Sequence, residues 1–318
     1  MKSHSNSDAR KVVIAALLGN LGIALAKFVA AWLSGSTAIL AEGVHSLADT
    51  GNQGLLLVGM GLAKQQLPDR YPLGRDKESY FWAFIVALLL FFVGGVFAVY
   101  EGVRHLFQTE TGHGSLWIPL GVLVVSLLME GGSFFVAFRE FNKSRGGQGF
   151  FQSLFSGKDP TIPVVLLEDT AAVCGLAVAF VAILVSALTH NPLADAIGSI
   201  VIGVLLCTVG LLLARYTRSL LLGEGVTPEV RARTLAVIES TPGVLQVTQF
   251  LSMHLGPEAV ILALKVRFPP QMVLEEVERV INEIEARVRA EVPQMSKIFV
   301  EPDSGYDATQ DLSLRPTP

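Results

Sequence analysis

The chain has 318 residues, of which 51% are hydrophobic and only 16% are charged, and its mean hydropathy is +0.52. This composition is too apolar for an ordinary soluble domain and indicates several membrane spans, while the small net charge of -4 and the lack of a basic block argue against nucleic acid as a partner. Cys174 and Cys207 lie in separate apolar segments, so we interpret them as buried hydrophobic residues and not as a disulfide or CxxC site.

The first 222 residues contain the apolar segments. A membrane-spanning helix needs about 20 mostly apolar residues. Six segments meet this rule and are predicted to be transmembrane helices: 12–33, 37–63, 81–106, 116–138, 162–188 and 193–222. Lys and Arg gather before the first helix, after the second and fourth, and at the end of the sixth. The positive-inside rule therefore predicts that both termini lie in the cytoplasm.

Residues 223–303 have the composition of a small soluble domain. Thr227, Pro228 and Glu229 are typical of a helix start, because Thr caps the helix and Pro fits its first turn. Strands are predicted at 244–254, 259–268 and 297–300, with a long amphipathic helix at 272–291. This order predicts a small α+β domain. The predicted organisation is thus a cytoplasmic segment 1–11, an all-α membrane domain 12–222, the α+β domain 223–303 and a disordered tail 304–318.

The second apolar segment carries a histidine and a carboxylate one helical turn apart. His45 and Asp49 are four residues apart, so they share one face of a helix, and Glu42 joins that face. An uncompensated charge in hydrocarbon is expensive, which makes such groups candidates for function. An imidazole and a carboxylate at this spacing form a reasonable half of a site for a divalent metal.

The fifth apolar segment supplies the other half. Asp169 adds a third ligand to His45 and Asp49, and Glu168 or water completes the four that zinc prefers. Adjacent helical residues point about 100° apart, so Glu168 is the weaker candidate: either it reaches the site through a bend or it serves another helix. Because His and carboxylates bind metal only when deprotonated, protons would compete with the metal, and this favours metal/proton exchange.

Further polar residues interrupt the apolar segments. For the three amide residues and Lys27, hydrogen bonding between helices and a functional role remain equally open. For the two carboxylates, Glu130 and Asp195, a functional role is the first interpretation, because ionisable groups inside a membrane are costly. These residues are Asn20, Lys27, Asn52, Gln53, Glu130 and Asp195.

Three motifs carry a resemblance to a known family: AEGVHSLADTGNQ at 41–53, YPLGRDKE at 71–78 and EDTAAV at 168–173. The sequence resembles the cation diffusion facilitator family of metal/proton antiporters, and within it the branch of mitochondrial zinc transporters and their bacterial relatives. The resemblance implies six transmembrane helices, a cytoplasmic ferredoxin-like domain, a homodimer, and export of a divalent cation, zinc, with protons as counter-ion. It also implies a bacterial inner-membrane location, no resident cofactor, and a charge pair between Lys77 and Glu224.

The sequence departs from the family at several positions. Val165 stands where the family has a second histidine, which leaves His45 as the sole nitrogen ligand. Tyr71 and Arg75 occupy positions that often hold a second metal in the family, and neither side chain can serve as such a ligand. In the C-terminal domain a single matching histidine, His254, is too little for a metal centre, so none is expected there. Manganese, iron, cobalt or nickel, and a non-transporting scaffold with a degenerate site, remain alternatives. An intramembrane metalloenzyme would need a catalytic base, and no HExxH motif is present, so an enzyme is not expected.

Overall fold

The computed structural model describes residues 4–34, 37–107, 117–144, 149–189 and 193–303, although some side chains within these helices, among them 37–42, 44 and 45, lie outside the description. The chain forms two compact units. The first comprises Met1–Gln65 and Lys77–Leu221, and the second comprises Gln66–Asp76 and Leu222–Pro318. The predicted tail at 304–318 lies outside the described residues.

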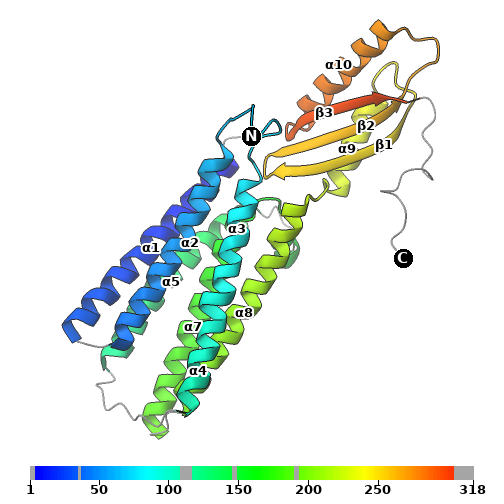
Figure 1. Cartoon of the computed structure of the whole chain (residues 1–318). Coiled ribbons are helices and arrows are strands. Elements are labelled where there is room, and N and C mark those ends of the chain that lie inside the picture. The colour runs from blue at the N-terminus through cyan, green and yellow to red at the C-terminus, as the bar shows by residue number, and fades with distance from the viewer. Residues whose placement is uncertain (1–3, 35–36, 108–116, 145–148, 190–192, 304–318) are drawn as a thin grey trace. The chain divides into compact units, whose positions relative to one another are not determined.

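The first unit is a bundle of long helices (Figure 1). It contains α1 (His4–Ser34), α2 (Thr37–Ala63), α5 (Trp117–Ser144), α7 (Thr161–Thr189), α8 (Leu193–Leu222) and the continuous run from α3 to α4 described below. Within the described residues, five segments are long and apolar enough to cross a membrane: Ala9–Ala30, Glu78–Phe107, Leu120–Lys143, Thr161–Ser186 and Leu193–Leu222. The sixth predicted segment is the 27-residue helix α2, so the predicted six-helix fold class is confirmed.

The third predicted span contains a π-helical turn that the sequence pattern did not reveal. This turn, η1 (Leu90–Val96), joins α3 (Glu78–Leu89) to α4 (Phe97–Phe107), and the three run as one helix (Figure 1). In a stretch that is apolar on all sides, no polar face marks the helical register. The one extra residue of a π turn therefore leaves no sign in the sequence pattern.

Glycines bring α8 against this helix, because residues without a side chain let helix backbones approach closely. A Cβ atom on Gly203 would lie 2.6 Å from the backbone N of Val99, and one on Gly210 would lie 2.8 Å from the backbone N of Phe91. Cys207 of α8 meets Gly95 in the same way. The predicted burial of Cys174 is wrong, because its side chain is exposed on α7.

A short helix, α6 (Phe150–Ser156), precedes α7 and was not predicted, since seven residues are too few to show a clear helical period. The ring of Phe150 packs against those of Phe138 and Phe141 in α5. The Tyr216 hydroxyl of α8 donates to the carbonyl of Gly157 at 2.7 Å, which fastens the end of α6 to the bundle.

The second unit is the predicted α+β domain. It contains α9 (Pro228–Glu239), β1 (Gln246–Gly256), β2 (Ala259–Arg267), α10 (Leu274–Glu291) and β3 (Met295–Pro302). The sheet has the order β1-β2-β3, with β1 antiparallel to β2 and β2 parallel to β3. The parallel pair requires a crossover, which α10 supplies. The predicted Thr227 cap is present, because its Oγ1 accepts a hydrogen bond from the Val230 N–H at 3.4 Å.

The core of this unit lies between α10 and the sheet. The predicted apolar stripe of α10 is buried at Val277, Val280, Ile284 and Val288, whereas Val273 at its start is exposed. The loop Gln66–Asp76 belongs to this unit although it connects two helices of the first.

Candidate metal site

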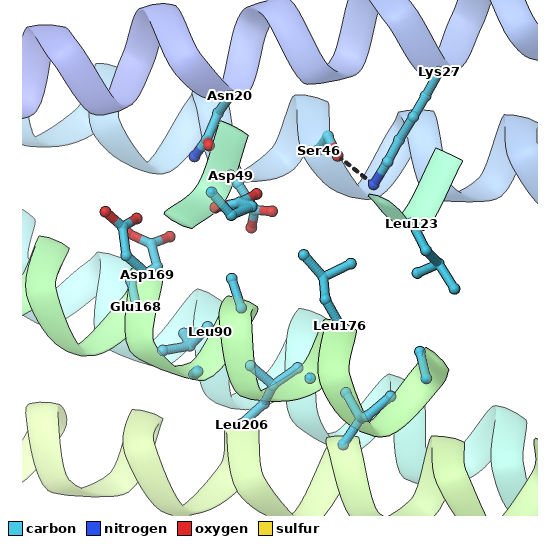
Figure 2. Close-up of a pocket in the computed structure, with 16 residues that line it drawn as sticks. Asn20, Lys27, Ser46, Asp49, Leu90, Leu123, Glu168, Asp169, Leu176 and Leu206 are labelled. Carbon is cyan, nitrogen blue, oxygen red and sulfur yellow. Dashed lines mark hydrogen bonds between the residues drawn. The ribbon is translucent and has the colours of Figure 1, made fainter. Parts of the chain in front are cut away.

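A cavity of about 110 Å³ lies inside the helical bundle of the first unit (Figure 2). Carboxylate side chains from three helices line it: Asp49 from α2, Glu130 from α5, and Glu168 and Asp169 from α7. Apolar side chains, including Leu90 and Leu206, form the remaining wall.

Small residues on α1 and α2 allow the helices around the cavity to approach closely. A Cβ atom on Gly22 would lie 2.9 Å from Met129 Cε of α5, and one on Gly43 would lie 3.2 Å from Phe28 Cδ1 of α1. Glycine at such positions lets helix backbones come together in a membrane. Glu130, the next residue after Met129 on α5, lines the cavity.

Glu168 is held by two amide side chains of α2. Asn52 Nδ2 donates to Glu168 Oε1 at 2.8 Å, and Gln53 Nε2 donates to Glu168 Oε2 at 3.0 Å. Gln53 in turn accepts a hydrogen bond from Asn20 Nδ2 of α1 at 3.3 Å. These three polar residues therefore do form hydrogen bonds between helices, and because their links end on a carboxylate of the cavity, a functional role stays open as well.

Asp169 is held from the opposite side. Ser133 Oγ of α5 donates to Asp169 Oδ2 at 2.8 Å. The adjacent carboxylates thus diverge as their helical positions require, one toward α2 and the other toward α5. Both side chains line the cavity (Figure 2), and the contacts of Glu168 with α2 fit the alternative that it serves another helix, while its role as a metal ligand stays a prediction.

The residues of α2 are described unequally. Asp49 is partly buried and lines the cavity. The backbones of Glu42 and His45 lie in α2, but both side chains are outside the described part of the chain, so His45 stays a predicted ligand. Among the described side chains alone, no group of three or more His, Cys, Asp or Glu is arranged to hold a metal ion.

Other candidates lie away from the cavity. Asp195 is exposed at the start of α8. His254 is buried in β1 of the second unit, where its Nδ1 lies 3.4 Å from the Gly256 carbonyl. Lys77 Nζ donates to the carbonyl of Leu221 at 3.3 Å, and its pairing with Glu224 stays a prediction.

Sequence reasoning gave Glu130 a functional interpretation but no place in the metal site, and it missed Ser133. Glu130 is 6% exposed, and Ser133 follows it by three residues on the same face of α5. The sequence signal that could have identified both residues is a carboxylate and a hydroxyl three residues apart within an apolar helix. All four carboxylates supply oxygen atoms, and oxygen atoms are ligands that zinc and other divalent cations accept.

Known families and proteins match both units. The family domain described as "Cation efflux transmembrane domain" matches residues 13–222, and "Cation efflux protein, cytoplasmic domain" matches residues 226–304.

Individual relatives match most of the chain. The mouse "Proton-coupled zinc antiporter SLC30A9, mitochondrial" is 33% identical over 77% of this chain, and the Arabidopsis thaliana "Metal tolerance protein C4" is 31% identical over 85%. The chain spans only 44% and 60% of these two proteins. The "Magnetosome protein MamB" of Paramagnetospirillum magneticum is 23% identical over 95% of this chain and 97% of its own length.

The transmembrane match alone covers more than half of the chain, and the cytoplasmic match covers most of the remainder. The chain therefore belongs to the cation efflux family, also called the cation diffusion facilitator family.

Proposed function

We propose that this protein is a proton-coupled secondary transporter that moves a divalent metal cation, zinc, out of the cytoplasm. The observation that carries the proposal is the convergence of Asp49, Glu130, Glu168 and Asp169 on one cavity inside a bundle of membrane helices. Carboxylates at this depth are costly unless a positive charge compensates them, and a divalent cation provides that charge.

The proposed ligands are His45, Asp49 and Asp169, with Glu168 as an auxiliary ligand. Among the described contacts, Asp169 accepts a hydrogen bond at Oδ2 only, so Oδ1 remains available to a metal. Both oxygens of Glu168 already accept an amide hydrogen bond, which suits a group that holds a helix position and assists coordination. A hydrogen-bonded carboxylate keeps its orientation, and such support is typical of metal ligands.

Metal release is proposed to follow from protonation of the same groups. Imidazole and carboxylates bind metal in their deprotonated forms, so protons entering the cavity displace the metal. A proton gradient across the membrane can then drive metal movement. The printed name of the mouse relative, a proton-coupled zinc antiporter, supports both the cargo and the counter-ion.

The remaining expectations concern the assembly and its location. We propose a homodimer that associates through the second unit, in a bacterial inner membrane with both termini in the cytoplasm. The clustering of Lys and Arg in alternate loops supports this orientation. The match of 226–304 to the family's cytoplasmic domain supports the cytoplasmic side for the second unit.

The test is metal uptake by proteoliposomes that contain a zinc-sensitive dye and carry an imposed pH gradient. The Asp49→Ala variant is expected to lose zinc uptake while remaining folded, because the cavity loses one of its carboxylates. Asp195→Ala is the matched control, since this aspartate is exposed outside the cavity, and it is expected to keep uptake. Full uptake by Asp49→Ala would refute the site.

Competition between metals in the same assay separates the remaining alternatives. Manganese, iron, cobalt and nickel are added in turn against zinc, and the strongest competitor identifies the cargo. A protein that moves none of these metals under any pH gradient would be a scaffold with a degenerate site.

A further inference from the structure

Lys27 is a buried basic residue that the proposed transport mechanism does not use. Its side chain is 5% exposed in α1, and its Nζ donates to Ser46 Oγ of α2 at 2.9 Å. Both residues line the cavity that contains the carboxylates (Figure 2). Lys27 lies inside the membrane-spanning segment Ala9–Ala30, three residues before its end, and a charged side chain buried within such a segment calls for a compensating interaction.

The pairing of α1 with α2 fixes the place of Lys27 in the cavity. Two polar contacts join these helices, Asn20 with Gln53 and Lys27 with Ser46, and the contacts are seven residues apart on each helix. Seven helical residues span about 10 Å. Asp49 lies between Ser46 and Gln53 on α2, so the Lys27 contact and the amides that hold Glu168 flank Asp49 from opposite ends.

The charges around the cavity are unequal in number. Of the charged side chains that line it in the described part of the chain, Lys27 alone is basic, against Asp49, Glu130, Glu168 and Asp169. Charges in a medium of low polarity interact strongly over several ångströms. The Lys27 ammonium therefore offsets part of the negative charge of the cavity when no metal is present.

We propose that Lys27 is a tethered counter-cation that competes with the transported metal for the carboxylates. In the metal-free cavity its ammonium group neutralises part of their charge, and an entering divalent cation displaces it. This lowers the affinity of the cavity for metal and favours release, which a transporter needs as much as binding. The inference rests on the proposed function, because it assigns Lys27 a role in that same site.

A purely structural role makes a different prediction. Lys27 could serve only as a polar link between α1 and α2, through its hydrogen bond to Ser46. If packing and hydrogen bonding were its whole role, removing its charge would leave metal affinity unchanged or weaken it. A counter-cation predicts the opposite sign, namely tighter binding.

The experiment measures zinc affinity of the full-length protein in detergent at constant pH, by competition with a chelating dye, and zinc uptake in proteoliposomes. Lys27→Gln removes the charge and keeps a hydrogen-bonding group, and is expected to bind zinc at least about tenfold more tightly and to transport it more slowly. Lys27→Arg keeps the charge and is expected to retain the wild-type affinity. Lys64→Gln, a matched loss of charge at the exposed residue that follows α2, is expected to change neither quantity.

Unchanged or weaker zinc binding by Lys27→Gln would overturn the inference while leaving the proposed function intact. A wild-type protein that binds no zinc would overturn the proposed function and this inference with it. If Lys27→Gln does not fold, the double variant Lys27→Gln with Glu130→Gln distinguishes a counter-cation from a purely structural role. A counter-cation predicts that this double variant recovers folding because one negative charge has also been removed, and failure to recover would assign Lys27 to packing.

Discussion

At the scale of single residues, each carboxylate of α7 depends on a different helix for its orientation. Glu168 is held by amides of α2, whereas Asp169 is held by Ser133 of α5. A movement of α2 relative to α5 would therefore change the separation of the two carboxylates. In the proposed transporter, such a change would couple helix movement to metal release.

The Ser133 contact can be tested with a matched serine on the same helix. Ser133→Ala removes the donor to Asp169 and is expected to weaken zinc binding several-fold, since a hydrogen bond to a charged group contributes about 1.5–3 kcal/mol in water and somewhat less between membrane helices. Ser126 lies seven residues earlier and is 2% exposed, compared with 8% for Ser133. Ser126→Ala is expected to bind zinc as the wild type does, and equal losses in both variants would contradict a specific role for Ser133.

The predictability of the site also differs from residue to residue. Asp49, Glu168 and Asp169 could be found from the sequence, because ionisable groups in apolar segments are conspicuous. The contacts of Ser133 with Asp169 and of Lys27 with Ser46 could not, since they depend on the register between helices that are distant in the chain. A serine in an apolar helix also has local hydrogen-bond partners, so its presence alone predicts nothing.

At the scale of elements, close packing of helices depends on a few glycines and not on all of them. Gly203 of α8 faces the backbone of α4, whereas a Cβ atom on Gly51 of α2 would meet nothing within 4 Å. In the sequence, the glycines of both helices look alike. Only the structure shows that Gly203 lies at a close contact between helices and that Gly51 does not.

Alanine substitutions at these two glycines should have opposite effects on stability. Gly203→Ala places a methyl group 2.6 Å from the Val99 N atom and is expected to destabilise the protein, at a typical overpacking cost of about 1–3 kcal/mol. Gly51→Ala is expected to stabilise α2 by up to about 1 kcal/mol through higher helix propensity. Thermal unfolding in detergent measures both, and a stabilised Gly203→Ala would contradict the close approach of α8 and α4.

The elements themselves were largely predictable. The apolar segments and the alternation of helices and strands after residue 222 identified every long helix and all three strands of the described chain. The π-helical turn and α6 were not predicted, because neither a single extra residue nor a seven-residue helix changes the hydropathy pattern enough.

At the scale of the whole molecule, the two units have separate hydrophobic cores, so each is expected to unfold with its own stability. The three tryptophans, Trp32, Trp82 and Trp117, all belong to the first unit. Tryptophan fluorescence therefore reports on that unit alone, while hydrogen exchange of the backbone amides in β2 reports on the second.

Ile284→Ala tests this independence. Ile284 is fully buried in the core between α10 and the sheet, and its truncation is expected to destabilise the second unit by about 2–5 kcal/mol. Exchange in β2 should accelerate while the tryptophan transition stays in place. Ile281→Ala, the same change at a partly buried position of α10, is expected to have a smaller effect. A shift of both transitions in Ile284→Ala would show that the units unfold together.

The π-helical turn has a further consequence for how this stretch tolerates changes in length. A π turn accommodates one residue more than the corresponding α-helical turn. Deleting one residue from Leu90–Val96 is therefore expected to restore a regular α-helix with α3 and α4 still in their present orientations, whereas a deletion elsewhere in Glu78–Phe107 would rotate one end by about 100°. If a related chain lacks one residue at this turn, its helices are therefore expected to pack as they do here, with a regular α-helix in place of the π turn.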